Sequence, residues 1–140
     1  MFYIRMQVGS KEILIIMNKI CTSIEQSQKL IELGIDVSTA DMYYEPSPGF
    51  CTEPSEIRFG DIEYAHPRSI RSWSLVALLK LMPTKDKSNE YYVTTESHSD
   101  YHQVNYVNCW DGDIHETDSD DCLIDAAFEM ICWLKENEKI

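Results

Sequence analysis

The feature that most constrains this chain is a strongly apolar segment near its C-terminus, from Cys122 to Asn137. Many of its apolar residues recur at the spacing of one helical face. They are Leu123, Ala127, Met130, Ile131 and Leu134. Further apolar side chains widen that face until only a narrow polar line remains, through Asp125, Glu129 and Glu136. Because a helix that is apolar over most of its circumference must be covered by other elements, we expect this helix to lie at the centre of the fold.

The residues just before this helix offer N-cap oxygens, and their negative charge suits the positive end of a helix dipole. They are Asp118, Ser119, Asp120 and Asp121. The longer acidic run that begins at Asp111 is the alternative basis for a divalent-cation site. That run does not follow the spacing of an EF-hand loop, and a turn followed by a capped helix start explains its positions. We therefore expect neither a metal site nor a cofactor.

The overall composition is that of one folded domain. The chain has 140 residues, of which 44% are hydrophobic and 26% are charged. No run approaches the roughly 20 apolar residues of a membrane-spanning helix, and the apolar run Ile13–Met17 lacks a signal-peptide cleavage pattern. Five cysteines, an odd number without a C-x-x-C pair, are typical of reduced thiols rather than of a disulfide framework. These features indicate a cytoplasmic protein that does not engage membranes.

The first residues differ from the rest of the chain. Residues 1–16 allow two interpretations: a non-native extension, with Met17 as the natural start, or a strand-forming extension through Met6–Val8 and Ile13–Ile16. Residues 17–140 are expected to form a single α+β domain.

Local signals predict two further helices. Ser23 with Gln26 three residues later forms a capping-box pattern, and Gly34 suits the end of the same helix. A second helix is expected from Ser72 or Ser74 to Met82, where Pro83 stops it.

The strand signals predict antiparallel pairing. Alternation on both sides of Gly60–Asp61 favours a hairpin over residues 56–64. A three-stranded meander is expected over residues 91–95, 104–110 and 113–117, with Asp111–Gly112 as its second turn. The expected fold is therefore α+β: an antiparallel sheet, made of the hairpin and the meander, packed against about three helices with the C-terminal helix central.

Negative charge is concentrated in one part of the chain. The net charge is −12, and residues 88–134 contain eleven acids but no lysine or arginine. Residues 1–87 are nearly balanced, with 11 acids and 10 bases. Because phosphate binding needs a basic surface, we expect no direct binding of nucleic acid.

Three segments follow recognisable patterns. Residues 72–83 read W-S-x-x-x-L-L-x-L-x-P, and residues 125–137 read D-A-x-x-x-x-x-x-W-L-x-E-N. Together with residues 30–42, they resemble small uncharacterised proteins of gut Bacteroidetes, their prophages and other mobile elements. The resemblance implies association with a phage or mobile element. It implies no activity and no site residues, because these are packing and capping patterns.

A small hydrolase is the alternative to a non-enzymatic protein. Such an enzyme would use carboxylates, or Cys109 with a histidine, and an acid pair converging with His102 or His115 in a pocket would favour it. The spacing of His98 and His102 would suit zinc on a helix, but here it flanks an expected turn. The chain has no P-loop, no G-x-G-x-x-G and no G-x-S-x-G motif. We therefore assign no catalytic residue and favour a protein that is not an enzyme.

Aromatic residues gather on the expected meander, in the acidic part of the chain. Outward-facing aromatics with acids around them would suit a basic protein surface. The binding candidates are Tyr106, Trp110, Asp111, Asp113 and Glu116. For Tyr106 and Trp110 we favour core packing over exposure, because large aromatics carry much of the burial in a small core.

The sequence thus predicts a small non-enzymatic interaction protein whose acidic C-terminal half attracts a basic protein partner. A sharper form of the hypothesis is imitation of nucleic acid toward a DNA-binding protein. The simpler alternative is that the acids only keep the surface soluble. The sequence does not indicate an oligomeric state.

Overall fold

The computed structural model describes residues 2–8, 11–17, 19–45, 56–59, 67–86 and 88–140. These residues contain α1 (Ile24–Glu32), α2 (Leu75–Leu81), α3 (Leu123–Glu136) and a short 3-10 turn (Val37–Thr39). Their strands are β1 (Phe2–Val8), β2 (Lys11–Met17), β3 (Met42–Glu45), β4 (Glu56–Phe59), β5 (Ile70–Ser72), β6 (Lys85–Asp86), β7 (Asn89–Ser97), β8 (His102–Asn108) and β9 (Ile114–Ser119). All strand pairs between these elements are antiparallel, so the α+β class is confirmed.

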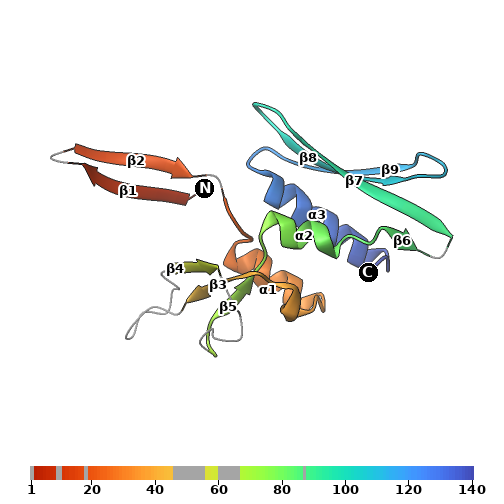
Figure 1. Cartoon of the computed structure of the whole chain (residues 1–140), viewed down its shortest axis with the longest axis horizontal. Coiled ribbons are helices and arrows are strands. Elements are labelled where there is room, and N and C mark those ends of the chain that lie inside the picture. The colour runs from red at the N-terminus through yellow and green to blue at the C-terminus, as the bar shows by residue number, and fades with distance from the viewer. Residues whose placement is uncertain (1, 9–10, 18, 46–55, 60–66, 87) are drawn as a thin grey trace.

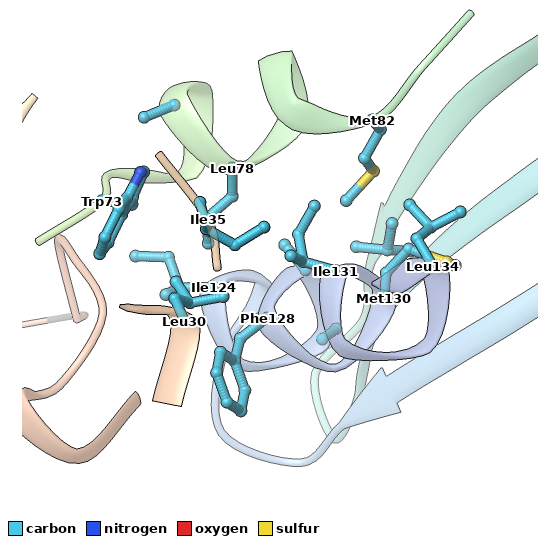
Figure 2. Packing of buried hydrophobic residues seen from close by; sticks show 14 of the residues in the cluster. Leu30, Ile35, Trp73, Leu78, Met82, Ile124, Phe128, Met130, Ile131 and Leu134 are labelled. Carbon is cyan, nitrogen blue, oxygen red and sulfur yellow. The ribbon is translucent and has the colours of Figure 1, made fainter. Parts of the chain in front are cut away.

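Helix α3 lies at the centre of the fold, as expected. The four-stranded sheet covers one side of it, and α2 packs against another (Figure 1). Figure 2 shows Leu78 of α2 and Leu30 of α1 close to Ile124 and Ile131 of α3. The buried residues of α3 are Ile124, Ala126, Ala127, Phe128, Met130, Ile131 and Leu134. Since each large apolar side chain gains about 1.5–3 kcal/mol on burial, this helix supplies much of the core.

The start of α3 differs from the expectation. Its N-cap is Cys122, which makes no side-chain capping hydrogen bond. The expected cap from the residues before α3 is wrong. Asp118 and Ser119 belong to β9, which continues to Ser119. Ser119 Oγ instead accepts a hydrogen bond from the Asp121 N–H, at 3.2 Å, in the connection to α3.

The sheet over α3 has the strand order β6-β7-β8-β9. The expected meander forms its last three strands, and the short strand β6 adds to the β7 edge. Val104 and Tyr106 point from β8 into the core that α3 shares. Side chains alternate between the two faces of a sheet, so the odd-numbered positions of β8 face away from α3.

A second sheet has the order β4-β3-β5. Strand β4 is the first strand of the hairpin expected at residues 56–64, and it pairs with β3. The expected turn at Gly60–Asp61 and the return strand to Tyr64 lie outside the described residues. A separate hairpin pairs β1 with β2, from Phe2–Met17 to Val8–Lys11. Residues 2–8 and 11–17 thus form strands, while the natural start at Met17 stays a prediction.

The predicted N-terminal caps of α1 and α2 are present. Ser23 Oγ accepts from the Gln26 N–H at 3.1 Å, and Gln26 Oε1 accepts from the Ser23 N–H at 3.0 Å. Gly34 follows α1 with φ of +82°, a conformation that favours glycine. Ser74, not Ser72, caps α2, since its Oγ accepts from the Ala77 N–H at 3.2 Å.

A buried polar cluster around Thr22 joins α1 to the second sheet. Thr22 Oγ1 lies 2.7 Å from Ser27 Oγ and 3.0 Å from Ser72 Oγ. The Trp73 N–H donates to Thr22 Oγ1 at 3.1 Å, and Tyr44 Oη donates to the Thr22 carbonyl at 2.9 Å. Burial raises the pKa of Tyr44, so this hydroxyl keeps its proton. Because each polar group has a partner, the cluster avoids the cost of buried unsatisfied groups.

An ion pair fastens α3 to the start of α1. Lys19 Nζ lies 2.7 Å from Asp125 Oδ1, and the Gln26 amide donates to the same oxygen at 2.8 Å. The Lys19 side chain is only 11% exposed and that of Asp125 is 23% exposed. Burial raises the pKa of Asp125, but hydrogen bonds from Lys19 and Gln26 outweigh it and hold that pKa below its usual range. The polar line of α3 predicts Asp125 as part of an acidic surface, but its pairing with Lys19 contradicts that expectation.

Replacing Asp125 by Asn should lower the free energy of unfolding at neutral pH by about 1–3 kcal/mol, because Lys19 would keep its charge without a counter-ion. The folded pKa of Asp125 is depressed, so its contribution is complete above the unfolded value of about 3.9 and is lost as pH falls through the folded pKa. Urea unfolding of both proteins from neutral pH to pH 2 should show this difference shrinking toward zero. Glu129→Gln, an exposed change on the same helix, should stay within about 0.5 kcal/mol throughout. A difference that persists at low pH would contradict the ion-pair account.

Candidate interaction surface

The face of the four-stranded sheet that points away from α3 is the candidate site. We call it the outer face, and it consists of three cross-strand rows on β7, β8 and β9. The first row is Tyr92, Val107 and Ile114; the second is Thr94, Asn105 and Glu116; the third is Glu96, Gln103 and Asp118. The face thus changes from apolar at one end to acidic at the other.

The exposure of these residues agrees with an uncovered sheet face. Tyr92 is 49% exposed and Ile114 is 53% exposed, although both are large and apolar. Val107 lies between them on the central strand, is only 5% exposed and belongs to no buried core cluster. Its neighbours in the row therefore cover it in place of a helix. None of the described helices packs on this face, because α3 lies on the opposite one.

A buried amide sits in the middle of the outer face. The Asn105 side-chain nitrogen donates to Thr94 Oγ1 at 3.2 Å. Asn105 Oδ1 is buried and has no hydrogen-bond partner within the described parts of the chain. Because buried polar atoms are normally satisfied, this acceptor is an unusual feature at the centre of a surface.

The acids of residues 88–134 are distributed over several places. Glu96, Glu116 and Asp118 belong to the outer face. Glu90 lies on the same face of β7, two residues before Tyr92. Glu90 forms an exposed ion pair with Lys85 at 3.3 Å. The remaining acids lie in the turns, in the connection to α3 or on α3 itself. The acidic segment therefore forms one face only in part.

The connection between β8 and β9, residues 109–113, carries three of the binding candidates. Trp110 is 72% exposed, so the prediction that this residue packs in the core is wrong. Its backbone N–H donates to Asn108 Oδ1 at 2.9 Å, and the Asp113 N–H donates to Asp111 Oδ1 at 2.8 Å. Gly112 has φ of +73°, so the turn lies where it was expected, but it is longer than the expected Asp111–Gly112 pair because the Asn108 N–H donates to the Asp113 carbonyl. Strand β8 ends at Asn108, before the tryptophan, and that is why Trp110 points into solvent.

Tyr106 packs in the core, as the sequence predicts. It is 3% exposed, its ring stacks on Tyr91 at 4.6 Å, and its hydroxyl donates to the Pro83 carbonyl at 2.7 Å. It also lines a cavity of about 190 Å³, together with Asp113 and His115 among others. His115 stacks on Trp133 with ring centroids 3.6 Å apart. Burial lowers the pKa of His115, and Glu116 opposes this shift.

The five candidates do not form one site. Glu116 lies on the outer face, Trp110 and Asp111 lie in the turn, and Tyr106 and Asp113 line the cavity. Tyr92 and Ile114 were not among the predicted binding residues, although both are exposed on the outer face, and neither was the buried Asn105 at its centre. Alternation within each strand indicates which residues share a face, but the pairing register is needed to align the three strands into rows.

The described residues do not bring together the groups that the hydrolase alternative needs. Cys109 is exposed in the connection after β8, whereas His115 stacks on Trp133 of α3. His102 Nδ1 lies 3.1 Å from Ser97 Oγ, but this exposed pair has no hydrogen-bonded acid in the described chain. Burial raises the pKa of Cys132 to about 11, which opposes thiolate formation. Within the same residues, no three His, Cys, Asp or Glu side chains are grouped to hold a metal ion.

The helices of the described chain are too short or too polar to span a bilayer. No family model, no curated protein and no solved structure matches this chain.

Proposed function

We propose that the protein is a non-enzymatic interaction protein whose outer face binds a basic surface of another protein. The observation that carries this proposal is the arrangement of the three rows. The apolar row with Tyr92 and Ile114 is followed by a row with one acid and then by a row with two acids, and no lysine or arginine stands in any of the three. Interfaces combine apolar contact with complementary charge in this way.

The geometry favours a protein partner over simple solvation of a charged surface. Solvation explains acids, but it does not explain Tyr92 and Ile114 on an open sheet face, since surface area of this kind is costly in water. Asn105 Oδ1 supports the same proposal, because this buried acceptor has no partner in the described chain and lies at the centre of the proposed surface.

We further propose that the protein acts in the cytoplasm and is associated with a phage or mobile element. The four described cysteines are unpaired thiols, which suits a reducing compartment such as the cytoplasm. Association with a phage or mobile element rests on the resemblance of residues 30–42, 72–83 and 125–137 to proteins of that origin. An enzymatic role is not favoured, since no observation in the described residues supports one.

Removing two acids from the outer face should weaken binding of a short lysine-rich peptide. We expect the double variant Glu96→Gln/Asp118→Asn to lose about tenfold in affinity at about 0.1 M salt, where charges are screened over about 10 Å. The loss should nearly vanish at about 1 M salt, where that length is about 3 Å. Calorimetric titration at both salt concentrations measures the two affinities.

The matched control is Glu129→Gln/Glu136→Gln, which removes the same charge from exposed positions of α3. It should leave the affinity within about twofold of the original protein, because it changes net charge but not the outer face. Equal losses in the two double variants would show that only the total charge matters. That result would contradict the proposed surface.

A further inference from the structure

The outer edge of the four-stranded sheet is formed by β9. The strand order ends there, and no described strand pairs with its far side. Such an edge presents backbone N–H and C=O groups that can pair with another chain. Strand β9 spans six residues, Ile114–Ser119, whereas β6 at the opposite edge spans two. The β9 edge is therefore the longer template of the two.

The hydrogen bonds of the sheet identify which backbone groups of β9 face outward. The Asn108 N–H donates to the Asp113 carbonyl at 2.9 Å, directly before the first β8–β9 pair. Hydrogen-bonded pairs recur every second residue in an antiparallel ladder, so they fall on His115, Thr117 and Ser119. The backbone groups of Ile114, Glu116 and Asp118 then point away from β8. In the described chain, no loop or strand forms a backbone hydrogen bond to them.

The side chains beside this edge select the partner by charge. Ile114, Glu116 and Asp118 are all exposed and belong to the outer face. An added strand would place its own alternate residues next to these three, within the short distance of cross-strand pairs. Lysine or arginine would be favourable beside Glu116 and Asp118, and the aliphatic part of such a side chain would suit Ile114. A second copy of β9 would instead set acids against acids, which opposes self-pairing.

We infer that the β9 edge accepts an extended basic segment of a partner protein as an additional strand of the sheet. The inference rests on the proposed function and specifies its mode of binding. The segment alternates lysine or arginine with apolar residues, its backbone pairs with Ile114, Glu116 and Asp118, and its basic side chains lie on the outer face. This mode of peptide recognition obtains affinity from backbone pairing and selectivity from alternate side chains.

Amide hydrogen exchange in the full chain tests the inference directly. The probe is a short peptide of alternating lysine and valine, and exchange is followed by NMR with and without it. Binding should slow exchange at the amides of Ile114, Glu116 and Asp118, while those of His115, Thr117 and Ser119 are already protected by β8. The same peptide methylated on the amides that face β9 keeps its charge and should bind about tenfold more weakly.

A pair of variants separates backbone pairing from side-chain contact. Ile114→Pro removes an outward N–H at the first residue of the strand, where proline is tolerated, and should weaken peptide binding more than Ile114→Ala does. The methylated peptide keeps the test decisive if the proline variant does not fold. Binding that leaves the three outward amides unprotected, and that tolerates methylation, would overturn strand addition but not the proposed function. Absence of binding to any basic peptide at low salt would overturn both.

Discussion

The structure depends on burial of α3 from several sides. Seven of its fourteen residues are buried, and they contact both the inner face of the four-stranded sheet and the helices that precede the sheet in sequence. A helix with so much apolar surface cannot remain in water, so other elements must cover it. Figure 2 shows how Trp73, Leu78 and Ile35 converge on it from elements distant in sequence. This arrangement uses one face of the sheet for the core and leaves the other face open.

Polar contacts fix the elements around this apolar centre. Lys19 and Gln26 meet Asp125 at the start of α3, and the cluster at Thr22 joins α1 to β5. The patterned segments at residues 72–83 and 125–137 also have structural roles. Trp73 is fully buried and its indole donates to Thr39 Oγ1 at 2.9 Å, while the next residue, Ser74, caps α2. At the other end of the chain, the Asn137 amide donates to the Trp133 carbonyl at 2.8 Å.

Much of the fold could be predicted because its signals are local. The caps at Ser23 and Ser74, the turn at Gly112 and the apolar pattern of α3 each depend on a few neighbouring residues. The errors arose where distant segments compete for a residue. Asp125 was expected on the surface, but Lys19 reaches it from more than a hundred positions away in sequence. The site was harder to predict for the same reason, since its rows depend on the register of three strands.

The central claim is that α3 is the element on which the rest of the fold depends, and native-state hydrogen exchange tests it most directly. The amides of Ala127, Met130, Ile131 and Leu134 should exchange only through global unfolding, and their opening free energy should equal that from urea unfolding. The amides of β6 should open at much lower free energy, because this strand is two residues long and lies at an edge. If the amides of α3 exchanged at a lower opening free energy than those of β8, that result would contradict the account.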